Sequence, residues 1–178
     1  MGLATLLLFP LVGWILYLFI PNSFKTPFEL MFYIHPQHYF YIPIFLSIGI
    51  LFGLFVIWLT ELNYFEKSMS KYKNILENFE LNIFYVVFLS VAAGVGEEIF
   101  FRGVLQPIFG IVITAIFFVA IHGYFSLKNK RINIFAILLT GFICVLGWGS
   151  KDISLLVAMC AHFAYDLVLL FYYKNYNK

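Results

Sequence analysis

The chain has 178 residues, of which 63% are hydrophobic and 11% are charged, and its formal net charge is +2. Soluble domains contain about 45–50% apolar and about 25% charged residues, so this composition excludes a soluble globular fold. The mean hydropathy of +0.94 agrees with an integral membrane protein. The small net charge, with no basic tract among the aromatic residues, argues against nucleic acid as a partner.

Six apolar runs are candidates for transmembrane helices, because a helix that crosses a bilayer needs about 20 apolar residues. They are Leu3–Ile20, Tyr39–Thr60, Leu81–Gln106, Phe109–Phe125, Ile132–Trp148 and Ile153–Tyr173. The dipeptide Gln106-Pro107 predicts a tight turn after the third run, and Ser150, Lys151 and Asp152 predict the turn before the last. The predicted fold class is all-α: a polytopic transmembrane helical bundle of about six spans.

Residues 61–80 differ from these runs because they hold seven charged side chains. Their apolar residues recur every three or four positions, a pattern typical of an amphipathic helix at the membrane interface. These residues are Phe65, Met69, Tyr72, Leu76 and Phe79. We therefore divide the chain into residues 1–80, with two N-terminal spans and this interfacial helix, and residues 81–178.

Lys and Arg residues in the connections predict the orientation in the membrane. With six spans, one side carries eight of them and the other side carries only Lys25 and Lys151. The side with eight also holds both termini, so we expect both termini in the cytoplasm. In a prokaryote the membrane would be the plasma membrane.

Small residues predict where helices approach one another closely. Gly49 and Gly53 are four residues apart and therefore share one helix face. Ala158 and Ala161 lie beside polar residues in the last span. Small side chains let two membrane helices pack backbone to backbone, so we expect close helix contacts at both positions.

Polar side chains that interrupt the predicted spans are the strongest functional signal. A charge at mid-bilayer costs about 2.5–3.5 kcal/mol on insertion scales, so such residues usually face the protein interior or a wet cavity and have a function there. The six residues are Glu97, Glu98, Arg102, His122, His162 and Asp166.

Spacing separates the two glutamates of the third span. Glu98 and Arg102 are four residues apart, which favours an ion pair on one helix face. Glu97 lies about 140° from Arg102 around the helix and has no obvious partner there. A buried carboxylate without a partner suits a general base that works near neutral pH. The alternative is that all three residues form one structural ionic cluster.

The two histidines also have neighbours one turn away. Phe118 precedes His122 by four residues, so the ring can pack against the imidazole. Asp166 follows His162 by four residues, where it can accept the ring N–H and fix the tautomer. The alternatives are a histidine that serves only a helix contact and a polar clamp between helices.

Taken together, these groups could activate a water molecule and stabilise an oxyanion. A zinc ion is an alternative, with Glu97, His122 and His162 as its ligands and Asp166 as the outer partner of His162. A count along straight helices places Glu97 and His122 about 10 Å apart in membrane depth.

Three motifs in order resemble those of the CPBP intramembrane protease family, EExxxR, FxxxH and HxxxN/D. They are Glu97-Glu98-Ile99-Phe100-Phe101-Arg102-Gly103, Phe118-Val119-Ala120-Ile121-His122 and His162-Phe163-Ala164-Tyr165-Asp166. The family includes the type II CAAX prenyl endopeptidases and the bacteriocin-immunity or abortive-infection (Abi) membrane proteins. The resemblance implies that residues 81–178 are the catalytic core. It also implies that Glu97 and His122 activate water, that His162 and Asp166 hold the oxyanion, and that Glu98 and Arg102 support the site.

We therefore expect an intramembrane endopeptidase that needs no cofactor. Its partners would be membrane lipid and a peptide or protein substrate, prenylated or not, and no nucleic acid. Two alternatives remain: a non-catalytic immunity or partner-binding protein, and a proton or ion pathway. A protease requires the polar groups to converge on one point, whereas a pathway requires them to be spread through the membrane depth.

Overall fold

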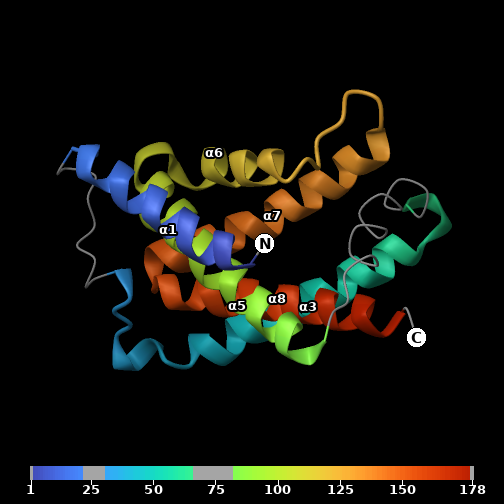
Figure 1. Cartoon of the computed structure of the whole chain (residues 1–178), viewed down its shortest axis with the longest axis horizontal. Coiled ribbons are helices and arrows are strands. Elements are labelled where there is room, and N and C mark those ends of the chain that lie inside the picture. Colours follow the sequence, from blue (N-terminus) through green and yellow to red (C-terminus); the bar gives the residue numbers. More distant parts are fainter. Residues whose placement is uncertain (1, 22–30, 66–81, 177–178) are drawn as a thin grey trace.

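The computed structural model describes residues 2–21, 31–65 and 82–176, and within these ranges every regular element is helical (Figure 1). The predicted interfacial stripe lies, beyond Phe65, outside the described residues. The elements are α1 (Gly2–Phe19), η2 (Pro36–His38), α3 (Tyr41–Glu61), α5 (Ile83–Glu98), η3 (Ile99–Leu105), α6 (Gln106–Ile121), α7 (Lys130–Asp152) and α8 (Leu155–Tyr176).

Four helical runs among the described residues are long and apolar enough to cross a membrane: Pro36–Glu61, Ile83–Ile121, Lys130–Asp152 and Leu155–Lys174. Thr5–Phe19 in α1 is a shorter apolar helix. These runs and the all-helical fold identify an integral membrane protein. The count of six spans is not confirmed, because the expected third and fourth spans form one helical run of 39 residues.

The expected turn at Gln106-Pro107 is wrong. The chain stays helical there, with Pro107 in the first turn of α6, and it leaves helical geometry at Gly110, where φ is 76° and ψ is 171°. Proline is tolerated in the first turn of a helix because an N–H at that position has no partner in its own helix. Positive φ, by contrast, is readily adopted only by glycine. The chain therefore changes direction at Gly110.

The turn before the last helix is also shifted. Ser150, Lys151 and Asp152 belong to α7, and the connection to α8 is Ile153 and Ser154. The backbone N–H groups of both connecting residues donate to the carbonyl of Gly149, each at 3.0 Å. The helix therefore continues past its apolar run, since its backbone hydrogen bonds do not depend on apolar side chains.

Helix α8 lies at the centre of the bundle, packed against α3, α5 and α7. A Cβ atom added at Gly49 of α3 would meet the carbonyl oxygen of Ala161 in α8. A Cβ added at Gly53, one turn further along α3, would lie 3.0 Å from Val168. The expected close helix contacts at Gly49 and Ala161 are confirmed, and each is the partner of the other.

The chain reverses between α5 and α6: α5 runs toward the left end of the view, and α6 runs back toward the right end (Figure 1). The C-terminal ends of α3, α6 and α8 point toward one end of the bundle, at the right of the view. The start of α6 and the turn between α7 and α8 lie at the other end. This reversal places the end of α6 over the middle of the bundle.

Candidate active site

A π-helical segment follows the two glutamates. Helix α5 ends at Glu98, and η3 continues it with wider turns in which the N–H of Gln106 donates to the carbonyl of Phe101, five residues earlier. Short π segments within α-helices frequently occur at functional sites. Glu97, Glu98 and Arg102 lie at this junction and are buried, with exposed fractions of 8%, 0% and 3%.

Glu98 is the most buried of these three residues, and it contacts both Arg102 and His162. Its Oε1 atom lies 2.9 Å from Nη1 of Arg102 and 2.7 Å from Nδ1 of His162. The ion pair between Glu98 and Arg102 expected from their spacing is therefore present. The contact with His162 joins two residues 64 positions apart in the chain and was not expected.

The second nitrogen of His162 faces Asp166. Nε2 lies 3.6 Å from Oδ2 of Asp166, which is too long for a direct hydrogen bond. The expectation that Asp166 accepts the ring N–H and fixes the tautomer is therefore wrong, because Nδ1 already donates to Glu98 at 2.7 Å. The packing of α8 on α5 supplies this closer carboxylate.

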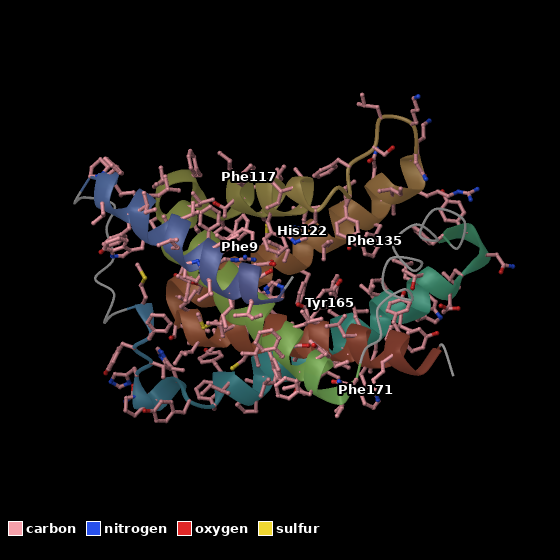
Figure 2. All side chains as sticks on the ribbon, in the orientation of Figure 1. Phe9, Phe117, His122, Phe135, Tyr165 and Phe171 are labelled. Carbon is pink, nitrogen blue, oxygen red and sulfur yellow. The ribbon has the colours of Figure 1, made fainter. Side chains whose placement is uncertain are left out.

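Glu97 and His122 approach each other from different helices. Oε2 of Glu97 lies 3.7 Å from Nε2 of His122, so the expected depth difference of about 10 Å is wrong. The position of the turn explains the difference, since Glu97 lies 13 residues before Gly110 and His122 lies 12 residues after it. Figure 2 shows His122 on the side of α6 that faces the bundle.

The ring of His122 has a defined tautomer when it is neutral. Its Nδ1 lies 2.7 Å from the carbonyl oxygen of Phe118. Because a carbonyl oxygen can only accept, Nδ1 carries the hydrogen in this contact. Nε2, which faces Glu97, is then left with a lone pair and can accept a hydrogen bond.

Phe118 holds several parts of the site together. Its ring stacks on His122 with centroids 4.4 Å apart and meets the ring of His162 edge to face at 5.8 Å. The guanidinium carbon of Arg102 lies 5.0 Å from the same ring centroid. The sequence predicted only the packing against His122, which is confirmed.

Exposure divides the site into an inner and an outer part. The side chains of Glu98, Arg102 and His162 are 0%, 1% and 5% exposed. Those of Glu97, His122 and Asp166 are 11%, 33% and 22% exposed. The outer part is therefore accessible from outside the protein, while the inner part is enclosed.

The alternative zinc site would take Glu97, His122 and His162 as its ligands. Within the described ranges, no three His, Cys, Asp or Glu side chains are arranged so that they could hold a metal ion. His162 directs one ring nitrogen at Glu98 and the other toward Asp166. Nδ1 of His162 is therefore occupied by Glu98, and Nε2 is the ring nitrogen that has no close hydrogen-bond partner among the described residues.

Gln106 is a further polar residue of this region that the sequence interpretation placed in a turn. Its Nε2 atom donates to the carbonyl oxygen of Gly147 at 2.8 Å and so ties the start of α6 to α7. A lone glutamine in an apolar run is the only signal that could have marked it.

A comparison with protein families finds one match. The family described as type II CAAX prenyl endopeptidase Rce1-like matches residues 79–168, which is about half of the chain and includes all six polar residues of the site. No curated protein and no solved structure matches the chain.

Proposed function

Because the chain belongs to the Rce1-like family of type II CAAX prenyl endopeptidases, an intramembrane protease family, we propose that it hydrolyses a peptide bond with a water molecule activated by Glu97 and His122. The observation that carries this mechanism is the 3.7 Å approach of Glu97 Oε2 to His122 Nε2. This contact brings together a carboxylate oxygen and an imidazole nitrogen on the accessible side of the site. Both atoms can accept a hydrogen bond.

Water activation follows from these two acceptors. A separation of 3.7 Å is too long for a direct hydrogen bond but allows one water molecule to bridge the two atoms. Such a water donates one hydrogen to Glu97 and the other to His122, which leaves a lone pair free to attack the scissile carbonyl. Glu97 takes the proton as the bond forms and returns it to the leaving amine.

His162 and Asp166 are proposed to stabilise the oxyanion that this attack creates. Because Nδ1 of His162 donates to Glu98, Nε2 can donate to an oxyanion only when the ring is an imidazolium. Asp166, with Oδ2 3.6 Å from Nε2, places a carboxylate beside that imidazolium. A preorganised donor at the oxyanion is usually a large part of the rate enhancement.

The arrangement favours hydrolysis over the two alternatives. The contacts between Glu98, Arg102 and His162 and those between Glu97 and His122 lie within 2.7–3.7 Å, and Phe118 contacts both histidines. The groups therefore converge instead of forming a series through the membrane depth, as a proton pathway requires. A purely structural cluster does not account for the accessibility of Glu97 and His122.

A prenylated substrate is supported by an apolar groove whose lining includes Leu167, the residue after Asp166. The groove has a volume of about 800 Å³ and lies between α3, α5 and α8, next to Asp166 along α8. An isoprenoid chain is a hydrocarbon, and its burial against such a lining is favourable. The lining residues are Leu54, Ile57, Ile83, Val87, Leu167, Val168, Phe171 and Tyr172.

The test is cleavage of a fluorescence-quenched prenylated CAAX peptide by the full chain purified in detergent. Glu97→Gln should lower kcat by about 10²–10⁴-fold, because it removes a general base but keeps the shape of the side chain. Glu61→Gln, the same change at the exposed end of α3, is the matched control. A wild-type rate in Glu97→Gln, or activity that is lost on chelation and restored by zinc, would overturn the mechanism.

A further inference from the structure

The loop between α6 and α7, residues 123–129, has features that no step of the proposed mechanism uses. It lies at the end of the bundle toward which α3, α6 and α8 run (Figure 1). Leu127 in this loop is fully exposed, and Phe125 is 44% exposed. The loop therefore presents apolar side chains that contact little of the protein.

Positive charge follows these apolar residues directly. Lys128, Lys130 and Arg131 lie within four positions, and both lysines are exposed. The sequence has no Asp or Glu between His122 and Lys151, so the loop and most of α7 carry only positive charge. Apolar side chains next to Lys and Arg are typical of segments that lie on an anionic membrane surface.

The place of the loop in the chain puts it at the membrane surface. It connects two runs that are long and apolar enough to cross a membrane, Ile83–Ile121 and Lys130–Asp152, and only residues 122–129 separate them. The counts of Lys and Arg predict that this end faces the cytoplasm, where anionic lipids give the membrane a negative surface potential. Anionic headgroups are therefore within reach of the loop.

Hydrogen bonds hold the loop in shape and connect it to the candidate active site. The backbone N–H of Ser126 donates to Oδ1 of Asn133, and Nδ2 of Asn133 donates to the carbonyl oxygen of Ser126, each at 2.8 Å. Gly123, with φ 78°, follows the end of α6, and His122 lies only four residues before Ser126. A contact that holds the loop on the membrane therefore also holds the end of α6 that carries His122.

Helix α6 benefits from such an anchor because it lies at the edge of the bundle (Figure 1). It packs mainly against α7 and η3, and its other face is exposed. The large exposed side chains on that face are Val112, Ile113, Ile116, Phe117 and Ile121.

We propose that this loop docks on anionic phospholipid headgroups through Lys128 and Lys130, with Leu127 inserted at the acyl boundary, and so anchors the end of α6 at His122. The effect on catalysis rests on the proposed function, whereas the docking does not. A lysine recognises free phosphate as well as a headgroup phosphate, but only a lipid also supplies an apolar phase for Leu127. An acidic segment of another protein is the competing partner.

Docking is measured with a fluorophore at the tip of the loop. The full chain carries Leu127→Cys together with Cys144→Ala and Cys160→Ala, which replace its two cysteines, and the thiol is labelled with the environment-sensitive NBD group. In nanodiscs, its emission should shift to shorter wavelength when phosphatidylglycerol replaces phosphatidylcholine, and inorganic phosphate should have no effect. Lys128→Gln should lower the equilibrium constant for insertion about fivefold, and Lys128→Arg should retain it. Lys174→Gln, near the end of α8 at the same end of the bundle, is the matched control.

Anchoring is measured in the unlabelled chain. Amide hydrogen exchange of residues 118–123 should be slower in phosphatidylglycerol than in phosphatidylcholine. The kcat for a prenylated CAAX peptide should be about tenfold higher in phosphatidylglycerol, with little change in KM, because His122 is better positioned. Lys128→Gln should reduce both differences, whereas Lys174→Gln should retain them.

The possible results separate the docking, the anchoring and the proposed function. The same emission in both lipids, or a shift that Lys128→Gln leaves unchanged, would overturn the docking. A shift with polyglutamate but not with phosphatidylglycerol would assign the loop to an acidic protein partner instead. Docking without slower exchange at the end of α6 would overturn the anchoring of His122. Docking and slower exchange without cleavage in either lipid would overturn only the proposed function.

Discussion

Replacing Glu98 should affect stability far more than replacing Glu97. Glu98 is fully buried, and its Oε1 contacts Arg102 at 2.9 Å and His162 at 2.7 Å. Glu98→Gln leaves the buried guanidinium without its counter-charge, which costs about 3–5 kcal/mol of unfolding free energy. For a chain of this length that corresponds to a loss of about 6–20 °C in Tm.

Glu97→Gln should change the unfolding free energy by less than about 1 kcal/mol, because Glu97 makes no contact closer than 3.7 Å with His122. Thermal unfolding of both variants in the same detergent gives the comparison. The double variant Glu98→Gln, Arg102→Met should recover part of the loss, since replacing both charges of a buried pair is often neutral. An equal loss of Tm in the two single variants would refute the assigned roles of the glutamates.

Three further predictions test the packing and the topology. Phe118→Leu should lower kcat at least tenfold with a smaller effect on KM, because Phe118 stacks on His122, whereas Phe117→Leu on the exposed face of α6 should not. Gly49→Ala should lower Tm, because its Cβ meets the backbone of α8, while Gly141→Ala in open space should leave Tm unchanged or raise it. Reporters fused at the C-terminus and in the turn between α7 and α8 should lie on opposite sides of the membrane, with the C-terminus in the cytoplasm. The same side for both would contradict a single crossing by α8.

Features that depend on local spacing could be predicted from the sequence. The pair of Glu98 and Arg102 follows from four-residue spacing, and the contact at Gly49 follows from small residues on one face. In both cases the geometry of a single helix decides which side chains share a face. The packing of Phe118 on His122 is predictable for the same reason.

Features that depend on how distant helices pack could not be predicted. Glu98 and His162 are 64 residues apart, and no periodicity in either helix indicates that they meet. The sequence therefore predicts Asp166, the nearest carboxylate along the chain, as the partner of His162, whereas the hydrogen bond is made by Glu98. A cavity of about 410 Å³ likewise has both Arg102 and Lys151 in its lining. The sequence places Arg102 in the third predicted span and Lys151 in the predicted turn before the last span.

The turn at Gly110 is the feature on which the site most depends, and it gives the last prediction. With the turn at Gln106-Pro107, Glu97 and His122 would lie at different depths. At Gly110 they lie 13 and 12 residues from the turn and face each other. The conformation of Gly110, with φ 76° and ψ 171°, is nearly exclusive to glycine and costs other residues about 1–3 kcal/mol.

Gly110→Ala separates backbone strain from steric clash, because nothing lies within 4 Å of a Cβ at this position. The chain can relieve the strain by shifting the start of α6, which moves His122 away from Glu97. We therefore expect kcat to fall about a hundredfold, as a displacement of about 1 Å can cause, while Tm falls by only a few degrees. Gly141→Ala, also in open space but within regular helix, is the matched control. Wild-type kcat together with a lowered Tm in Gly110→Ala would show that the turn stabilises the fold without positioning His122.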